Sequence, residues 1–504
     1  MRLALRAAFA AAVLAGVLSG AATAGQSGAD SLAEQSHQAR EFMAAGQFDR
    51  AIPLYRALTR ALPDNSGLAF DLGLALHMAG REREAAAVLR RSLALDPDSL
   101  PARLYLGNAE LSLGRPAAAV PLLRAVLRAK PEEAAARQSL AAALLELGRG
   151  GEAAAEYRRS IGNGPGTAAA WYGLGRSYAA IAQQAFDRLG RAAPGSAYWL
   201  ALAAGARAKA GQLSGAFYLY RQAQTKLPGL PGLHAAVAAI YRQSGHADWA
   251  AAEAARERPL DGSACERQPL ACAYQAGSYD RILAATAATP AALYWRARAA
   301  DRLAMQAFAR LGDFPDSAER HELLATLHAN ALDYAQAAAE WRAAYERSGH
   351  DPAIGTQLAM AWMQLHDFAD AGPLLETLRR QQPDSPQLSF LLGYIRLQQQ
   401  QPQRAIPLLA ASLRADPALA DAQRALAEAY LETGQTKLAI PHLKAALPLD
   451  EDGSLHYQLA RAYQAGGATQ AAQAALREYQ RLHQAAESAQ QTAQAQVQIL
   501  PPQP

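Results

Sequence analysis

The residues best suited to chemistry in this sequence are two histidines and a glutamate in its second half. His321 and Glu322 are adjacent, and His328 follows His321 by seven residues. A zinc-protease helix needs two histidines four residues apart, with a glutamate beside the first of them. That spacing is absent here. We therefore interpret these residues as part of a helix surface and predict no metal site and no catalytic residue among them.

The chain has two cysteines, Cys265 and Cys272, on either side of Pro269. Their spacing matches no metal finger, and no histidine flanks them. In an exported protein such a pair most often forms a disulfide, and closing this loop would contribute about 2.5 kcal/mol. We predict the disulfide. Free buried thiols, or a metal-binding or redox pair, are the alternatives.

Motifs for nucleophilic catalysis and for nucleotide binding are absent from the sequence. It contains no Gly-x-Ser-x-Gly, no phosphate-binding loop and no Gly-x-Gly-x-x-Gly. The acidic run Asp450-Glu451-Asp452 precedes an expected helix, where it would offset the helix dipole. We predict that the protein is not an enzyme and uses no cofactor.

The N-terminus has the features of a secretory signal peptide. Arg2 and Arg6 precede an apolar run from Ala7 to Leu18, and Ala22-Thr23-Ala24 follows. We expect cleavage after about Ala24, which would make the protein exported, either periplasmic or secreted. An uncleaved membrane anchor is the alternative, although the run is short for a span. We expect no transmembrane span in the mature chain.

Charge argues against a nucleic-acid partner. The chain carries a net charge of +4, and removal of the signal would lower it to +2, which is 47 basic minus 45 acidic residues. A near-neutral chain with interspersed signs has no nucleic-acid footprint.

The elements that would position any site follow a period of 34 residues. Alanine recurs at this spacing at Ala51, Ala85, Ala119, Ala153, Ala337, Ala371, Ala405 and Ala439. Proline follows the same spacing at Pro63, Pro97, Pro131 and Pro165, and again at Pro383 and Pro417. Such a period is the signature of stacked helical hairpins. Glycine then marks the turn inside each hairpin, at Gly46, Gly80, Gly114, Gly148, Gly211, Gly245, Gly434 and Gly467.

One segment carries a more specific pattern. Trp171-x-x-Leu174-Gly175-x-x-Tyr178 matches the first helix of a tetratricopeptide repeat letter for letter. The chain thus resembles the tetratricopeptide repeat family over nearly its whole mature length. The resemblance implies an all-α fold, a right-handed superhelical solenoid of antiparallel helix hairpins with a concave groove for a protein or peptide.

Regular hairpins and intervening segments can be placed on this period. We predict a signal peptide at 1–24, an N-terminal run at 25–167, an irregular middle at 168–317, a C-terminal run at 318–484 and a disordered tail at 485–504. Residues 485–497 could instead prolong the last helix. The regular hairpins are predicted at 32–65, 66–99, 100–133, 134–167, 197–230, 231–264, 318–351, 352–385, 386–419, 420–452 and 453–484.

The period breaks twice, and each break predicts a single long helix, at about 168–189 and 291–311. The segments 182–190 and 304–312 are identical at seven of nine positions. These helices are either drifted repeats with Phe186 and Phe308 in the core, or helices whose Gln and Arg faces bind a partner.

The concave wall is the remaining candidate site. In this family it is built from the face of each first helix that does not pack on the second. Projecting that face here predicts partner-binding residues at Phe70, Leu74, Met78, Asn108, Met360, Met363, Phe390, Tyr394, Arg424 and Tyr457. An apolar stripe rimmed by charge suggests a protein or peptide ligand, and the alternative is that packing buries part of the stripe. Only Asn108 and Arg424 resemble the family's clamp for C-terminal carboxylates, so chaperone-tail docking is not expected.

These features predict an exported scaffold or adaptor that binds a protein partner in a bacterial envelope assembly. An accessory subunit of a polysaccharide or glycan export or processing complex is the first alternative. A cytosolic regulator, or a hydrolase in the irregular middle, belongs to other classes of function.

Overall fold

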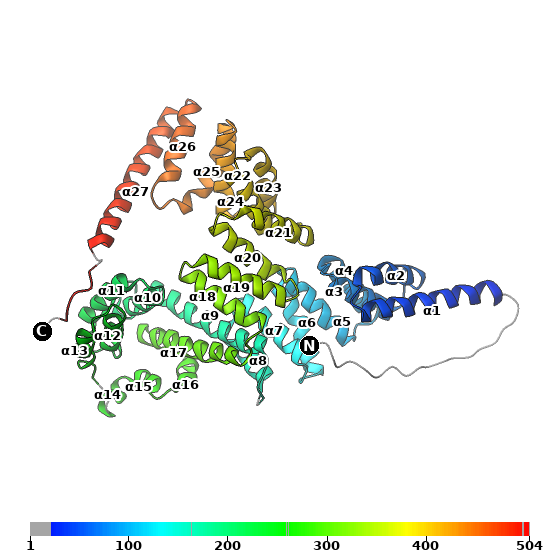
Figure 1. Cartoon of the computed structure of the whole chain (residues 1–504), viewed down its shortest axis with the longest axis horizontal. Helices are drawn as coiled ribbons and strands as arrows, with labels where there is room; N and C mark the ends of the chain where they lie inside the picture. The colour runs from blue at the N-terminus through cyan, green and yellow to red at the C-terminus, as the bar shows by residue number, and fades with distance from the viewer. Residues whose placement is uncertain (1–21, 163, 259, 261, 496–497, 503–504) are drawn as a thin grey trace. The chain divides into compact units, whose positions relative to one another are not determined.

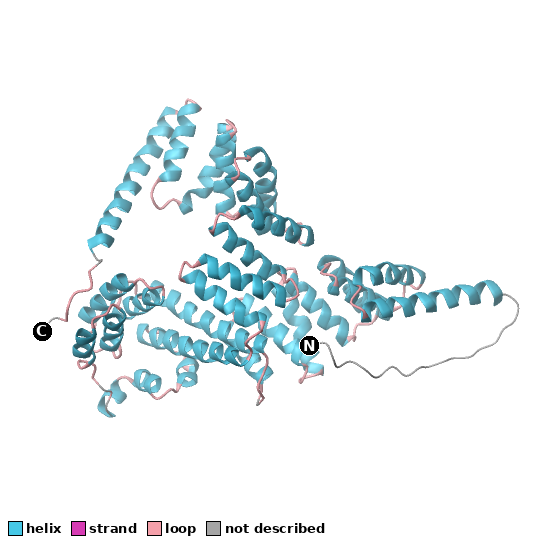
Figure 2. Ribbon diagram, viewed as in Figure 1, coloured by secondary structure: helices cyan, strands magenta, loops and turns pink. Residues whose placement is uncertain are grey.

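The computed structural model describes residues 22–162, 164–258, 260, 262–495 and 498–502. Within them the regular structure is entirely helical (Figure 2). The predicted all-α hairpin solenoid is therefore confirmed. Residues 1–21, most of the predicted signal peptide, lie outside the described part. None of the described helices is both long enough and apolar enough to cross a membrane.

The chain forms two compact units, Met1–Ser139 and Leu140–Pro504. The boundaries drawn at residues 167 and 317 from breaks in the period remain predictions. The described helices of the first unit are α1 (Ala22–Ala44), α2 (Phe48–Ala61), α3 (Ser66–Met78), α4 (Glu82–Leu95), α5 (Leu100–Ser112), α6 (Pro116–Ala129) and the beginning of α7 (Ala134–Glu146).

The second unit begins inside α7 and has a central and a C-terminal part (Figure 1). Its central helices are α8 (Gly150–Ile161), α9 (Ala168–Ala192), α10 (Ala197–Lys209), α11 (Leu213–Lys226), α12 (Leu233–Gln243), α13 (Ala247–Ala254), α14 (Gly262–Arg267), α15 (Pro269–Gln275), α16 (Tyr279–Ala284) and α17 (Pro290–Ala309). The C-terminal helices are α18 (Ala318–Asn330), α19 (Tyr334–Arg347), α20 (Pro352–Gln364), α21 (Phe368–Gln381), α22 (Pro386–Gln398), α23 (Pro402–Ala415), α24 (Ala420–Glu432), α25 (Thr436–Ala446), α26 (Ser454–Ala465) and α27 (Thr469–Ala495).

Small residues set the close contacts inside the hairpins. All the alanines of the 34-residue series have no exposed surface, namely Ala51, Ala85, Ala119, Ala153, Ala337, Ala371, Ala405 and Ala439. A Cβ atom on Gly73 of α3 would lie 2.6 Å from the Leu89 side chain of α4. Because no larger residue fits between the helices there, the period reflects packing.

The turn inside each hairpin uses a left-handed residue. Gly80 has a φ of +72° and ends α3. Its amide donates to the His77 carbonyl, and the amide of Arg81 donates to Leu76. Three turns use the same conformation without glycine, with φ of +62° at Leu332, +57° at His366 and +58° at Gln400. The backbone path is therefore kept where the glycine signal is lost.

The two long helices form one antiparallel pair. Helix α9 spans 25 residues and α17 spans 20, and the two pack along each other (Figure 1). Arg310, just beyond α17, lies 5.4 Å from the ring of Trp171 near the start of α9. Leu189, near the end of α9, shares a buried cluster with Leu293, near the start of α17. Helix α17 thus packs on α9 as a partner from a distant part of the sequence, in addition to its neighbour α8.

The duplicated segments use one face of each long helix for this packing. Ala185 and Leu189 are buried, as are Ala304, Ala307 and Leu311. Phe308 is half-buried against the backbone of Gly175, and Phe186 stacks on Trp199 with ring centroids 6.1 Å apart. The apolar positions therefore have the structural role that one interpretation of the sequence assigned to them.

Helices α10 to α16 connect α9 to α17 in the sequence. A disulfide joins Cys265 of α14 to Cys272 of α15, with Cα atoms 5.5 Å apart. The short helices α15 and α16 form a hairpin whose turn contains Gly277, with a φ of +70°.

The C-terminal segment differs from the expected disordered tail. Helix α27 continues to Ala495, as in the alternative in which this segment prolongs the last helix. Alanine and glutamine favour helix, which accounts for the extension. Beyond it, Ile499 packs against the buried cluster of α11 to α13, and the Tyr241 hydroxyl donates a 2.7 Å hydrogen bond to the Leu500 carbonyl.

Candidate functional site

The candidate site is the face of each first helix that points away from its second helix. The predicted residues come from six such helices, with Phe70, Leu74 and Met78 on α3, Asn108 on α5, Met360 and Met363 on α20, Phe390 and Tyr394 on α22, Arg424 on α24, and Tyr457 on α26. Met78, Met360 and Tyr457 expose 42%, 36% and 44% of their surface. Arg424 is also exposed, and the remaining predicted residues are half-buried.

In the first unit, α3 and α5 bring three aromatic side chains together. Phe70 lies 5.9 Å from Tyr105, and His77 meets the same tyrosine edge-on at 5.7 Å. The His77 ring is held by Glu82, with 2.8 Å between Nδ1 and Oε2. Among the described residues, the buried Oδ1 of Asn108 accepts no hydrogen bond. This face therefore combines aromatic surface with an unsatisfied acceptor, which natural structures rarely leave without a role.

In the second unit, the predicted face on α20 and α22 is partly used for packing. Phe390 packs against two successive buried clusters, so its ring supports the stack. Its centroid lies 6.2 Å from that of Tyr394. On the next first helix, Arg424 pairs with Asp421 at 3.3 Å. Of this group, the exposed Met360 and Arg424 are the side chains most accessible to a partner.

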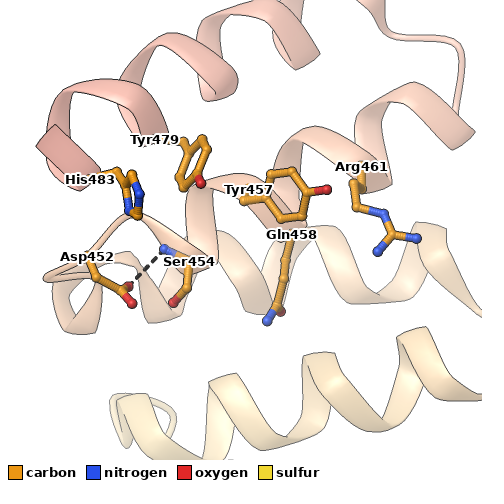
Figure 3. Close-up of a pocket in the computed structure, with 7 residues that line it drawn as sticks. All are labelled: Asp452, Ser454, Tyr457, Gln458, Arg461, Tyr479 and His483. Atoms are coloured by element: carbon orange, nitrogen blue, oxygen red, sulfur yellow. Dashed lines mark hydrogen bonds between the residues drawn. The ribbon is translucent and has the colours of Figure 1, made fainter.

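The last two helices form a pocket of about 400 Å³ around Tyr457 (Figure 3). Figure 3 shows Tyr479 between His483 and Tyr457, with Arg461 beyond Tyr457. The two tyrosine rings lie 5.3 Å apart, and Tyr479 lies 5.3 Å from His483. Such a row offers flat apolar surface with polar edges, which is typical of recognition sites for polypeptide.

Two oppositely charged side chains, Asp452 and Arg461, line this pocket. Asp452 accepts a 2.9 Å hydrogen bond from the Ser454 amide at the start of α26. That backbone hydrogen bond is the main reason why the pKa of Asp452 lies below its ordinary value. In the described chain, Arg461 has no ion pair or hydrogen bond. The pocket therefore presents a free guanidinium beside its aromatic row.

The polar side chains of Glu322, Arg176 and Tyr172 interact on the first-helix face where α9 meets α18. Burial raises the pKa of Glu322 to about 7, against an opposing effect of the Arg176 charge and a hydrogen bond with Tyr172. Burial likewise raises the pKa of the Tyr172 hydroxyl, helped by the charge of Glu322. A carboxyl that titrates near neutral pH thus lies beside an arginine on this face.

The histidines considered for metal binding are held apart by separate partners. His321 Nδ1 lies 2.6 Å from Glu340, whereas His328 Nδ1 lies 3.7 Å from Asp333. Among the residues that the structure describes, no cluster of three or more His, Cys, Asp or Glu side chains could hold a metal ion.

Sequence reasoning missed Tyr105, Tyr479 and His483. Tyr105 lies one helical turn before Asn108, which belongs to the projected face, so a wider projection would have included it. Tyr479 and His483 are four residues apart on a helix, a spacing that puts both side chains on one face. They belong to a second helix, however, and only the end of the stack leaves that helix uncovered by another hairpin.

Comparison with known proteins gives family matches in both units. Models described as tetratricopeptide repeat match residues 37–99, 104–168, 143–181 and 356–420, and a further model with the same description matches 396–455. No curated protein matches the chain.

Among solved structures, the fragment described as MamA 41-end from Desulfovibrio magneticus RS-1 is similar at 22% identity. The match covers 34% of this chain and 97% of that chain, with a TM-score of 0.31. MamA AMB-1 is similar at 25% identity over 33% of this chain and 98% of that chain, with a TM-score of 0.30.

Proposed function

Because this chain belongs to the tetratricopeptide repeat family, we propose that it is an exported, non-enzymatic scaffold that binds a protein or peptide partner along its first-helix face. Repeat stacks of this kind bury their cores within and between hairpins, which leaves one face of each first helix for binding. The proposed setting is a bacterial envelope assembly. This setting rests on the signal-like N-terminus and on the usual role of the family in binding proteins.

The aromatic row of α26 and α27 is the observation that carries the proposal. Tyr457 is 44% exposed beside Tyr479, and the unpaired Arg461 completes the pocket. Tyrosine and arginine dominate the binding energy of protein interfaces, because they offer large contact areas and directed polar groups. A peptide that lays an apolar side chain on the tyrosines could accept hydrogen bonds from the guanidinium.

Site-specific photo-crosslinking tests this assignment. A photo-reactive residue is placed at Tyr457 in one variant and at Met360 in another, and each full-length protein is irradiated in the envelope fraction of its own cells. Leu438 is the matched control. It is 49% exposed, but it lies on α25, which is the second helix of its hairpin and not part of the first-helix face. We expect the same polypeptide adduct at positions 457 and 360 and none at 438.

The outcomes separate the competing functions. Adducts of equal intensity at all three positions, or no adduct at 457 and 360, would contradict a binding face. An adduct that glycosidases remove and proteases leave intact would favour the alternative of a polysaccharide-associated subunit. In a purified complex, Tyr457→Ala should weaken binding about tenfold or more, the usual loss at an aromatic hot spot, whereas Leu438→Ala should change it little.

The export part of the proposal has its own test. N-terminal sequencing of the protein isolated from its native cells should give a chain that begins at Gly25. A chain that retains residues 1–24 would contradict export by a cleaved signal and would favour the anchored or cytosolic alternative.

A further inference from the structure

The pair of long helices borders a second pocket, distinct from the first-helix face. It has a volume of about 500 Å³ and lies among α8, α9, α16 and α17. Its walls are apolar, with Ile181, Leu283 and Leu293 among the lining residues. Its polar lining comes from Arg158, Gln184, Arg188, Asp280 and Arg296.

The charges of this pocket do not balance. Arg158 and Asp280 pair with each other at 2.8 Å. The Arg296 guanidinium donates to the carbonyl of Ala285, which is a neutral acceptor. Arg188 makes no hydrogen bond or ion pair among the described residues. Three arginines against one aspartate leave two positive charges without a carboxylate partner.

The two uncompensated arginines also lie close enough to repel each other. Burial lowers the pKa of Arg296, and the positive charge of Arg188 lowers it further. Keeping two like charges together beside apolar walls costs free energy unless an anion compensates them. The side chain of Arg188 is exposed, so a ligand can reach it from solvent, and that of Arg296 is half-buried.

Comparison of the duplicated segments shows that the arginine without an ion-pair partner among the described residues occurs only in the copy on α9. Arg310 occupies the position in the second copy that Arg188 occupies in the first. Arg310 pairs with Asp313 at 3.1 Å and lies over the ring of Trp171. The apolar face of both copies is used for packing. On the outward face of α9, Gln184 donates a hydrogen bond to the Gly148 carbonyl, and Arg188 is left for a ligand.

We propose that this pocket binds a small organic anion, a carboxylate or phosphate monoester attached to an apolar group. The guanidinium of Arg188 would bind the oxyanion as a two-pronged donor, and Arg296 would add its charge. Ile181, Leu283 and Leu293 would cover the apolar group. The assignment goes beyond the scaffold function, because it needs no protein partner.

Isothermal titration of the full-length protein with phenyl phosphate and with benzoate tests the proposal. Both probes carry the same ring and differ in the oxyanion, so their relative affinities show which anion the site prefers. Benzyl alcohol is the neutral control. We expect at least one anion to bind with a dissociation constant of about 1 mM or tighter, more weakly at higher salt, and benzyl alcohol not to bind.

Variants then place the binding in this pocket. Arg188→Gln should weaken binding of the anion about tenfold or more. Arg191→Gln should not, because Arg191 is exposed on the same helix but lies outside the pocket. Gly151→Leu tests the site without a change of charge. Gly151 lines the pocket, and a Cβ atom there meets nothing within 4 Å, so a leucine would fill the space and abolish binding.

Failure of both anions to bind the wild-type protein overturns the proposal. It is equally overturned if Arg191→Gln weakens binding as much as Arg188→Gln, or if Gly151→Leu binds the anion unchanged. None of these results bears on crosslinking at Tyr457, so the two proposals can fail independently.

Discussion

At the scale of the residue, Glu322 shows how the stack perturbs a single group. Its carboxyl is partly buried on the first-helix face beside Arg176 and Tyr172. Burial disfavours the charged form and outweighs the attraction of the arginine, so the pKa rises from 4.5 to about 7. The folded state therefore holds a proton that the unfolded chain has already lost at intermediate pH.

This shift predicts a pH dependence of stability with a definite sign. Because the folded pKa is the higher one, the free energy of unfolding should fall as the pH rises from 4.5 to about 7. Glu322→Gln should remove this fall and stabilise the protein by about 3 kcal/mol above neutral pH. Thermal unfolding across this range measures it, with Glu346→Gln on the exposed face of α19 as control. An unchanged pH profile in Glu322→Gln would contradict the assignment.

A second prediction concerns the turn residues. Leu332 has a φ of +62° and is 71% exposed, so it makes little packing contact in its left-handed conformation. Leu332→Gly should stabilise the hairpin of α18 and α19 by up to about 1 kcal/mol, since only glycine adopts this conformation without steric cost. Hydrogen exchange of the amides in these two helices gives the measurement.

The reverse substitution is its matched control. Gly434 has a φ of +73° at the corresponding turn, and a Cβ atom there meets nothing within 4 Å. Gly434→Leu should therefore destabilise α24 and α25 by a similar amount through the backbone alone. Equal exchange rates in wild type and both variants would show that the turn conformation is not under strain.

At the scale of the element, the disulfide joins two of the shortest α-helices in the described chain. Helices α14, α15 and α16 have only six or seven residues each, and helices this short are unstable alone. We expect Cys265→Ser with Cys272→Ser to destabilise this segment by about 2 kcal/mol. Limited proteolysis should then cleave between residues 262 and 284 sooner than in wild type. Two titratable thiols in the wild-type protein isolated from its native cells would contradict the bridge.

The pairing of α9 with α17 could be predicted only in part from the sequence. The missing glycine turn correctly predicted two uninterrupted helices at these positions. It could not predict that they pack on each other, because 97 residues separate the end of α9 at Ala192 from the start of α17 at Pro290. Repeat patterns describe contacts between neighbours in sequence, and this contact is between distant segments.

At the scale of the whole molecule, the C-terminal segment contacts helices from the middle of the chain. The Tyr241 hydroxyl reaches the Leu500 carbonyl across 259 positions in the sequence. Ile499 adds apolar contact to the cluster that holds Phe217 and Trp249. The segment thereby joins the end of the second unit to its central helices.

Deletion of residues 498–504 tests this contact. We expect faster hydrogen exchange in α12 and α13, because the deletion uncovers part of their apolar cluster. Tyr241→Phe removes only the hydrogen bond and should produce a smaller effect, on the order of 1 kcal/mol. Unchanged exchange in the deletion variant would show that the segment contributes nothing to the stability of these helices.

How much of the candidate site could be predicted depended on whether its residues follow the period. Tyr457 and Met360 could be placed on first helices from sequence position alone, and they lie exposed there. Phe390 followed the same rule but packs against two core clusters, which its place in the period does not record. The pocket beside the two long helices follows no period, since its residues come from α8, α9, α16 and α17.

The sequence by itself determined the hairpin stack, because the repeat contacts join helices that are neighbours in the chain. These contacts depend on small residues at a fixed spacing, such as Ala51 and Gly73. The sequence also located the interruptions and the paired cysteines. Only the tertiary structure decided that α17 covers α9, that Arg188 and Arg296 share one pocket, and that the last residues return to Tyr241. Those contacts join segments far apart in the chain, where no local spacing records which side chains will meet.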